Sequence, residues 1–200
     1  MRLGFDIDEV VCDLISYLCN YLTENYRVSW EPGCWTTYSL IDCDYSGCND
    51  KKFNNRVAID LWNRVFDLNF LMGCDAVKGA VKSLQLLKRH GHALHYITTR
   101  EKDKEYLTIK WLQSKGIPFD SVHHVGSIGE KGALGKSLNL DFFVDDLEKN
   151  LSSMLSHKKR WKKGLVLLDK PWNSNYYDDN KFIKLENWEQ IIRHLGINNR

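Results

Sequence analysis

The sequence has no apolar run long enough to span a membrane, which excludes an integral membrane protein built on helices. The first residues reach an acid at Asp6 and lack the apolar stretch of a secretory signal, so we expect a cytoplasmic protein. An excess of one charge is also missing. The 28 Lys and Arg residues nearly balance 26 Asp and Glu residues, and a formal net charge of +2 is too small to indicate a nucleic acid or a membrane surface as partner.

Cys-x-x-Cys pairs are absent, although the chain has six cysteines within its first 74 residues. Their spacings match no common zinc pattern. Disulfide frameworks usually belong to small secreted domains, and this chain of 200 residues has neither property. We therefore predict that the thiols are free. The cysteines are Cys12, Cys19, Cys34, Cys43, Cys48 and Cys74.

The composition is that of an ordinary globular protein, with 43% hydrophobic and 27% charged residues. From about residue 76, short apolar runs alternate with amphipathic segments of helical spacing. Such alternation is typical of a parallel sheet covered by helices on both faces, so we predict an α/β, Rossmann-like fold. Strands are expected at residues 3–5, 93–97, 121–125, 141–144, 164–168 and 182–185, and helices at 77–88, 104–115, 133–138, 147–157 and 188–195.

Residues 13–75 interrupt this alternation and are rich in aromatic side chains. Apolar residues recur at helical spacing over about 10–22 and 52–68, and glycine and proline break the stretch between these segments. We predict a small helical cap inserted after the first strand. Residues 1–12 and 76–200 would then form the main core.

Polar side chains follow three of the predicted strands. Asp6 and Asp8 follow the first strand, the pair Thr98 and Thr99 ends another, and residues 145–146, both Asp, end a third. The carboxyl ends of parallel strands lie at one edge of the sheet, where ligands bind. Each acidic pair alone could be a strand-end turn or a helix N-cap. Together they would repel one another, and Mg²⁺, which prefers oxygen ligands, would remove that cost.

Four segments resemble the four motifs of the haloacid-dehalogenase (HAD) superfamily, and they span nearly the whole chain. They are Phe5-Asp6-Ile7-Asp8, Tyr96-Ile97-Thr98, Lys131 and Phe143-Val144-Asp145-Asp146. Within that superfamily the chain resembles the 5'(3')-deoxyribonucleotidase family. This second resemblance rests on Trp35-x-x-Tyr38-x-Leu40 and on Asp169-Lys170-Pro171-Trp172-Asn173.

The resemblance implies a phosphohydrolase with a covalent intermediate. Asp6 would attack phosphorus and become an aspartyl-phosphate. Asp8 would protonate the leaving alkoxide and then activate the hydrolytic water. Thr98, with Thr99 close by, would donate to a phosphoryl oxygen, and Lys131 would neutralise charge on the nucleophile and the phosphoryl group.

The same resemblance implies Mg²⁺ as the cofactor. Its ligands would be Asp6, the backbone carbonyl of Asp8 and Asp146, with Asp145 just outside the coordination sphere. Asp145 and Asp146 could also exchange these roles. The sequence leaves one more alternative open, because Lys136 could replace Lys131.

Glu9 departs from the commonest HAD pattern, in which many relatives carry glycine at this position. The acid adds a further negative charge near the cation site. We expect its side chain to point away from the cation, toward the hinge of the cap.

Substrate selection is expected from the cap. Trp35 and Tyr38, chosen by the family resemblance, would stack on a nucleobase, since every base has a π-face. Arg100 would contact a phosphate or a base edge. The alternative for Arg100 is a surface salt bridge with Glu101 or Asp103.

The leading functional hypothesis is Mg²⁺-dependent hydrolysis of nucleoside monophosphates. A second is a phosphatase or phosphotransferase for another small phosphate ester, such as a sugar phosphate. A third, of a different class, is a catalytically silent nucleotide-binding or interaction protein. The sequence leaves base preference, sugar preference and oligomeric state open, a homodimer included.

Overall fold

A six-stranded parallel sheet forms the centre of the computed structural model, which describes residues 1–65, 67–158, 160–176 and 181–197. The strand order is β3-β2-β1-β4-β5-β6. The strands are β1 (Arg2–Phe5), β2 (Ala93–Thr98), β3 (Ser121–His124), β4 (Phe142–Asp145), β5 (Gly164–Leu168) and β6 (Ile183–Leu185). The predicted Rossmann-like α/β fold is confirmed.

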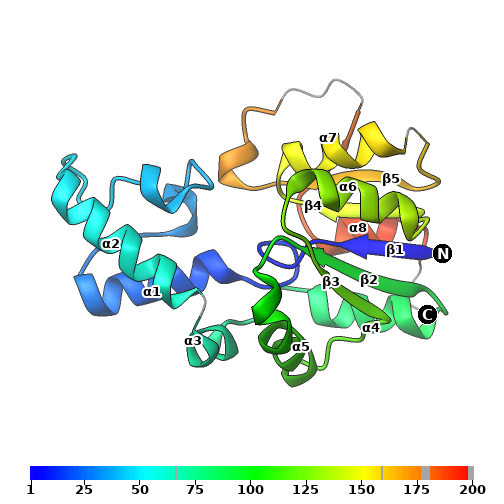
Figure 1. Ribbon diagram of the computed structural model, residues 1–200, viewed down its shortest axis with the longest axis horizontal. Helices are drawn as coiled ribbons and strands as arrows, with labels where there is room; N and C mark the ends of the chain where they lie inside the picture. Colours follow the sequence, from blue (N-terminus) through cyan, green and yellow to red (C-terminus); the bar gives the residue numbers. More distant parts are fainter. Residues whose placement is uncertain (66, 159, 177–180, 198–200) are drawn as a thin grey trace.

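Helices cover both faces of this sheet because successive strand residues point to opposite sides (Figure 1). Phe142 belongs to an apolar cluster that includes residues of α4, α5 and α8, whereas Phe143 belongs to a second cluster that includes residues of α6 and α7. The helices are α4 (Ala80–Arg89), α5 (Glu105–Ser114), α6 (Ile128–Ser137), α7 (Glu148–His157) and α8 (Trp188–His194). Two apolar cores therefore hold the sheet between them.

The strand order reverses at β1. The chain moves outward from β1 to β2 and β3, and then returns to the other side of β1 as β4. Such a reversal leaves a crevice at the carboxyl ends of the two central strands. Asp6 directly follows β1, and Asp145 is the last residue of β4.

The segment between β1 and α4 lies beyond the carboxyl ends of the strands (Figure 1). It contains α1 (Leu14–Tyr26), η1 (Pro32–Cys34), η2 (Leu40–Asp42), α2 (Lys51–Arg64) and α3 (Leu68–Gly73), where η marks a short 3₁₀ helix. We call residues 13–75 the insertion.

The two ends of the insertion run side by side. The backbone N–H of Asp13 donates to the Asp75 carbonyl at 2.9 Å, and that of Val77 donates to the Val11 carbonyl at 2.8 Å. The chain thus leaves and re-enters the core through one antiparallel two-stranded connection. That residues 13–75 behave as a separate cap domain stays a prediction.

Two helices of the insertion differ from the expected pattern. The segment 52–68, expected as one helix, is α2 followed by α3, and Asp67 caps α3 with a side-chain hydrogen bond. Phe66 lies outside the described residues. The first helix begins at Leu14 rather than near Val10, because the turn after β1 places Glu9 in the left-handed region at φ 61°.

Helix α6 begins five residues before the expected start at residue 133. Ser127 caps it by accepting a hydrogen bond from the Glu130 backbone N–H. Three glycines inside α6 weaken its apolar pattern. The earlier start places Lys131 on a helix rather than in a loop.

The six cysteines are free thiols, as predicted. None of the helices in the described ranges is both long and apolar enough to cross a membrane.

Glycine at position 132 allows α6 to approach α7. A Cβ atom there would lie 2.5 Å from the Ser153 carbonyl oxygen and close to its hydroxyl. We expect Gly132→Ala to lower the free energy of unfolding by about 1–3 kcal/mol, the usual cost of overpacking. Urea denaturation measures this. The matched control is Gly129→Ala, whose Cβ would meet nothing nearer than the Ser127 Oγ at 4.0 Å. A similar loss in both variants would contradict the packing explanation.

Candidate active site

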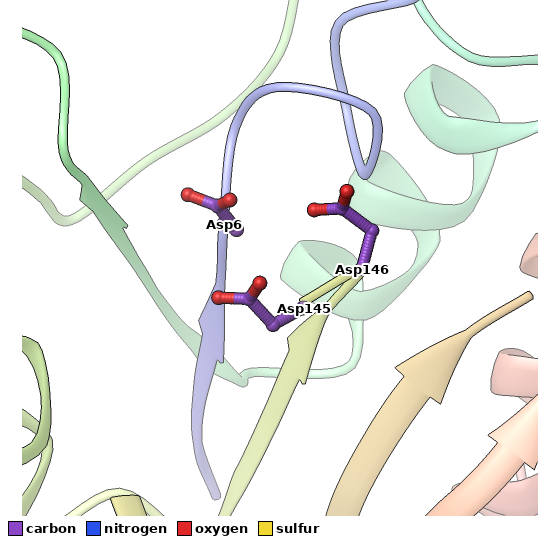
Figure 2. A group of neighbouring side chains, drawn as sticks. All are labelled: Asp6, Asp145 and Asp146. Carbon is purple, nitrogen blue, oxygen red and sulfur yellow. The ribbon is translucent and has the colours of Figure 1, made fainter. Parts of the chain in front are cut away.

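Three buried carboxylates meet where β1 and β4 end. Asp6, Asp145 and Asp146 each offer one oxygen, and these oxygens lie within 4.8 Å of one another. Figure 2 shows the three side chains gathered from the ends of the two neighbouring strands. The predicted clustering of acids from separate chain segments is therefore present.

The electrostatics of this cluster are unfavourable without a cation. Burial, the largest cause, raises the pKa of Asp6 from 3.8 to about 7; the Lys131 charge opposes this rise and the Asp145 charge adds to it. Burial, and then the charges of Asp145 and Asp6, also raise the pKa of Asp146 well above its usual value. Among the described residues, the buried Asp146 Oδ1 has no hydrogen-bond partner. Three carboxylates with an unpaired oxygen fit a hard divalent cation.

Lys131 is the cation that the protein itself places in the cluster. Its Nζ lies 2.9 Å from Asp6 Oδ1 and 2.7 Å from Asp145 Oδ2, and its side chain is fully buried. Burial alone would lower the pKa of this lysine, but the two acids outweigh it and raise the pKa above its ordinary value. Lys136 is exposed on another side of α6. The geometry thus favours Lys131 over Lys136.

Asp145 and Asp146 differ in whether a carboxylate oxygen remains without a hydrogen-bond partner. Asp145 accepts from Lys131 through Oδ2, and its Oδ1 accepts from the Leu147 backbone N–H and from Asn150 Nδ2, each at 2.9 Å. Asp146 instead keeps one unpartnered oxygen. This difference favours Asp146 as the cation ligand and Asp145 as the residue that orients Lys131. Sequence reasoning missed Asn150, because no motif marks it.

Asp8 forms a two-point ion pair with Arg100. Arg100 Nε lies 3.0 Å from Asp8 Oδ2, and Nη2 lies 2.5 Å from Oδ1. The alternative of a surface salt bridge with Glu101 or Asp103 is wrong, because the Arg100 side chain is buried against Asp8. Burial lowers the pKa of Arg100, but Asp8 more than compensates, so the guanidinium stays charged. Contact between Arg100 and a substrate stays a prediction.

The two threonines after β2 are placed differently. Thr98 is buried, and its Oγ1 accepts a hydrogen bond from the Arg100 backbone N–H at 3.2 Å. Thr99 is exposed. A role in phosphate binding stays a prediction for both.

The two aromatic residues predicted to contact a base also differ. Trp35 is fully buried inside the insertion, where its ring packs on Trp30 and its indole N–H lies 3.2 Å from the Cys19 Sγ. It has no accessible surface to offer a ligand in this arrangement. Tyr38 keeps 45% of its surface exposed, and its ring lies 6.2 Å from that of Trp172 in the core. The burial of Trp35 contradicts its predicted base contact, whereas base contact stays a prediction for Tyr38.

The segment after β5 supports the cluster, which sequence reasoning did not foresee. The Trp172 indole N–H donates to Asp146 Oδ2 at 2.9 Å, and Asn173 Nδ2 donates to the Asp146 carbonyl at 2.9 Å. Lys170 Nζ lies 3.0 Å from Glu9 Oε2. The only sequence signal was the family resemblance of residues 169–173, to which no role was attached.

Glu9 is directed at the hinge, as expected. Its Oε1 accepts a hydrogen bond from the Ile15 backbone N–H at 2.7 Å, at the start of α1. The second oxygen is paired with Lys170. Although buried, Glu9 is satisfied by these partners.

The fold is that of solved HAD-family hydrolases. A HAD-family hydrolase from Deinococcus radiodurans R1, described with bound phosphate and sodium, superposes with a TM-score of 0.63 at 13% sequence identity, covering 98% of this chain and 94% of that one. At this identity the likeness shows the fold alone.

The chain belongs to the family described as 5' nucleotidase, deoxy (pyrimidine), cytosolic type C protein, which it matches over residues 1–197. It is 25% identical over 196 residues to a 5'(3')-deoxyribonucleotidase of Bacillus subtilis, covering 96% of this chain and 97% of the relative. It is 30% identical over 111 residues to a nucleotidase of Clostridium acetobutylicum, covering 56% of this chain and 55% of that protein. It is thus a nucleotidase-family enzyme.

The raised pKa of Asp6 predicts a pH-dependent stability. The folded, metal-free protein holds a proton on Asp6 up to about pH 7, whereas the unfolded chain releases it near 3.8. The free energy of unfolding should therefore fall as pH rises between these values and level off above. Thermal unfolding of the chelator-treated protein measures this. Asp6→Asn should flatten the slope, and an unchanged slope in that variant would assign the effect to other groups.

The unpaired oxygen of Asp146 predicts that Asp146→Asn has opposite effects on stability without and with Mg²⁺. Asp146→Asn should stabilise the metal-free protein, because it removes one of three crowded negative charges. The same variant should lose most of the rise in Tm that millimolar Mg²⁺ gives the wild type. The control is Asp141→Asn, since Asp141 pairs with Lys162 instead. A full Mg²⁺ response in Asp146→Asn would exclude Asp146 as a ligand.

Proposed function

We propose that this protein hydrolyses nucleoside monophosphates with Mg²⁺ as cofactor, through an aspartyl-phosphate on Asp6. The observation that carries the proposal is the buried cluster of Asp6, Asp145 and Asp146 with Lys131 in contact with two of the three. The buried, unpaired Oδ1 of Asp146 supports the proposal, because most buried polar atoms in proteins are hydrogen-bonded.

In the first step Asp6 attacks the phosphorus of the ester. A bond forms between the carboxylate oxygen and phosphorus, and the bond from phosphorus to the ester oxygen breaks. The leaving alkoxide takes a proton from Asp8. Lys131 neutralises charge on Asp6, and Thr98 donates to a phosphoryl oxygen.

In the second step water attacks the phosphorus of the aspartyl-phosphate. Asp8 takes a proton from this water, and the bond between Asp6 and phosphorus breaks to release inorganic phosphate. Mg²⁺ held by Asp6, Asp146 and the Asp8 carbonyl would supply positive charge for the phosphoryl oxygens. The two bonds from Arg100 fix the orientation of the Asp8 carboxylate.

The proposed nucleotide specificity rests on Tyr38 and its surroundings. Its ring faces Trp172, and Lys149 Nζ lies 6.0 Å from the ring centroid. Two aromatic rings in contact beside the acid cluster favour a ligand with a planar base. The deoxyribonucleotidase among the relatives makes deoxyribonucleotides the first substrates to test.

Trp35 has a different part in this proposal. It packs the interior of the insertion and so holds the segment that carries Tyr38. A cytoplasmic location also belongs to the proposal, because the matched family is described as cytosolic.

The test is phosphate release from a panel of substrates with Mg²⁺. Ribo- and deoxyribonucleoside monophosphates, with the phosphate at 5' or 3', are compared with sugar phosphates and an aryl phosphate. We expect kcat/KM for the best nucleotide to exceed that for every sugar phosphate. A sugar phosphate as the best substrate would support a general small-ester phosphatase, and no turnover on any ester would support a silent binding protein.

The intermediate is tested by acid quenching during turnover. The peptide containing Asp6 should gain the mass of one phosphoryl group. Asp6→Asn should lose this adduct together with at least about 10³-fold in kcat, as expected on losing a covalent nucleophile. A label on another residue, or substantial activity of Asp6→Asn, would assign the nucleophile elsewhere.

A further inference from the structure

The short helix η4 (Pro171–Asn173) contacts both the acid cluster and the insertion. It follows β5 in the core and packs against η1 of the insertion. In Figure 1 this turn, drawn in orange, lies beside the blue 3₁₀ turns of the insertion. A shift of the insertion would therefore change the contacts that η4 makes with the core.

On the core side, η4 holds Asp146 at two points. The Trp172 indole N–H binds Oδ2, and the Asn173 amide binds the backbone carbonyl. The Asn173 amide also donates to the Leu168 carbonyl at 2.8 Å, which ties η4 to the end of β5. The indole bond restrains the Asp146 carboxylate through Oδ2, and Oδ1 is left without a hydrogen-bond partner among the described residues.

On the insertion side, the Trp172 ring meets Tyr38. The two ring centroids are 6.2 Å apart at an interplanar angle of 62°, an edge-on contact. The Lys170 ammonium lies 6.0 Å from the Trp172 ring centroid. One side chain thus binds a carboxylate of the cluster through its N–H and packs against the insertion through its ring.

We propose that Trp172 is a positioning residue that couples the place of the insertion to the orientation of Asp146. The Tyr38 ring holds the Trp172 ring, and Trp172 in turn presents Asp146 Oδ1 to the cation. If Tyr38 moves away with the insertion, the indole loses its support and Asp146 its fixed rotation. Cation binding is therefore tightest when the insertion lies over the site. This inference rests on the proposed use of Mg²⁺.

The experiment measures Mg²⁺ binding by calorimetry without substrate, in the wild type, Trp172→Phe, Tyr38→Ala and the double variant. Trp172→Phe keeps an aromatic ring but removes the N–H, and should weaken Mg²⁺ binding roughly tenfold, as removal of a group that orients a metal ligand does. Tyr38→Ala should weaken it by a smaller factor. In the double variant Tyr38→Ala should add nothing, because the bond that transmits its effect is already gone.

Trp161→Phe is the matched control. It removes an indole N–H that donates to the Lys158 carbonyl, away from the three acids. Its Mg²⁺ affinity should equal that of the wild type. Thermal unfolding of each metal-free variant separates lost positioning from lost stability, since positioning predicts a weaker affinity without a matching fall in Tm. Steady-state kinetics add a second readout. Trp172→Phe should raise the Mg²⁺ concentration for half-maximal rate more than it changes KM for the substrate.

Two results would overturn the inference while leaving the proposed function intact. One is wild-type Mg²⁺ affinity in Trp172→Phe. The other is an effect of Tyr38→Ala that multiplies with that of Trp172→Phe in the double variant, because it would show independent actions. Absence of Mg²⁺ binding in the wild type would instead overturn the proposed cofactor, and this inference with it.

Discussion

Repulsion among three buried carboxylates is the constraint on which the rest of the structure depends. Asp6, Asp145 and Asp146 come within 4.8 Å of one another at the reversal point of the sheet. Lys131 offsets them through ion pairs with Asp6 and Asp145. The close packing of α6 on α7, which glycine at position 132 allows, brings that lysine to the end of β4. The negative charge that Lys131 leaves uncompensated favours a bound cation, and a cation can stabilise the charge of a phosphoryl group.

The surroundings of the cluster give the acids different partners. Asp145 has both oxygens bound by protein donors, whereas Asp146 keeps one free. The Asp8 carboxylate is instead paired with Arg100. Identical side chains therefore differ through their partners, some of which, such as Trp172 and Arg100, come from elements far apart in the chain. The insertion joins this arrangement through Tyr38, whose ring meets Trp172 over the site.

Much of the fold could be predicted from the chain. Near-continuous apolar strands and helical spacing indicated a parallel sheet. The acids that follow predicted strands indicated the edge of the sheet at which a site would lie. The choice between Lys131 and Lys136 could not be made, because glycines in α6 hid the start of the helix. Trp35 and Tyr38 are three residues apart and both aromatic, yet one is buried in the insertion and the other reaches the core.

The sequence by itself determined which chemical groups are available and which predicted strand each of them follows. Side-chain periodicity and acids at strand ends are local properties of the chain. Only the tertiary structure decided which groups touch. Arg100 reaches Asp8 across 92 positions, and Trp172 reaches Asp146 across 26. Such contacts depend on the directions in which packed elements point, and the apolar pattern of a single segment does not encode those directions relative to another segment.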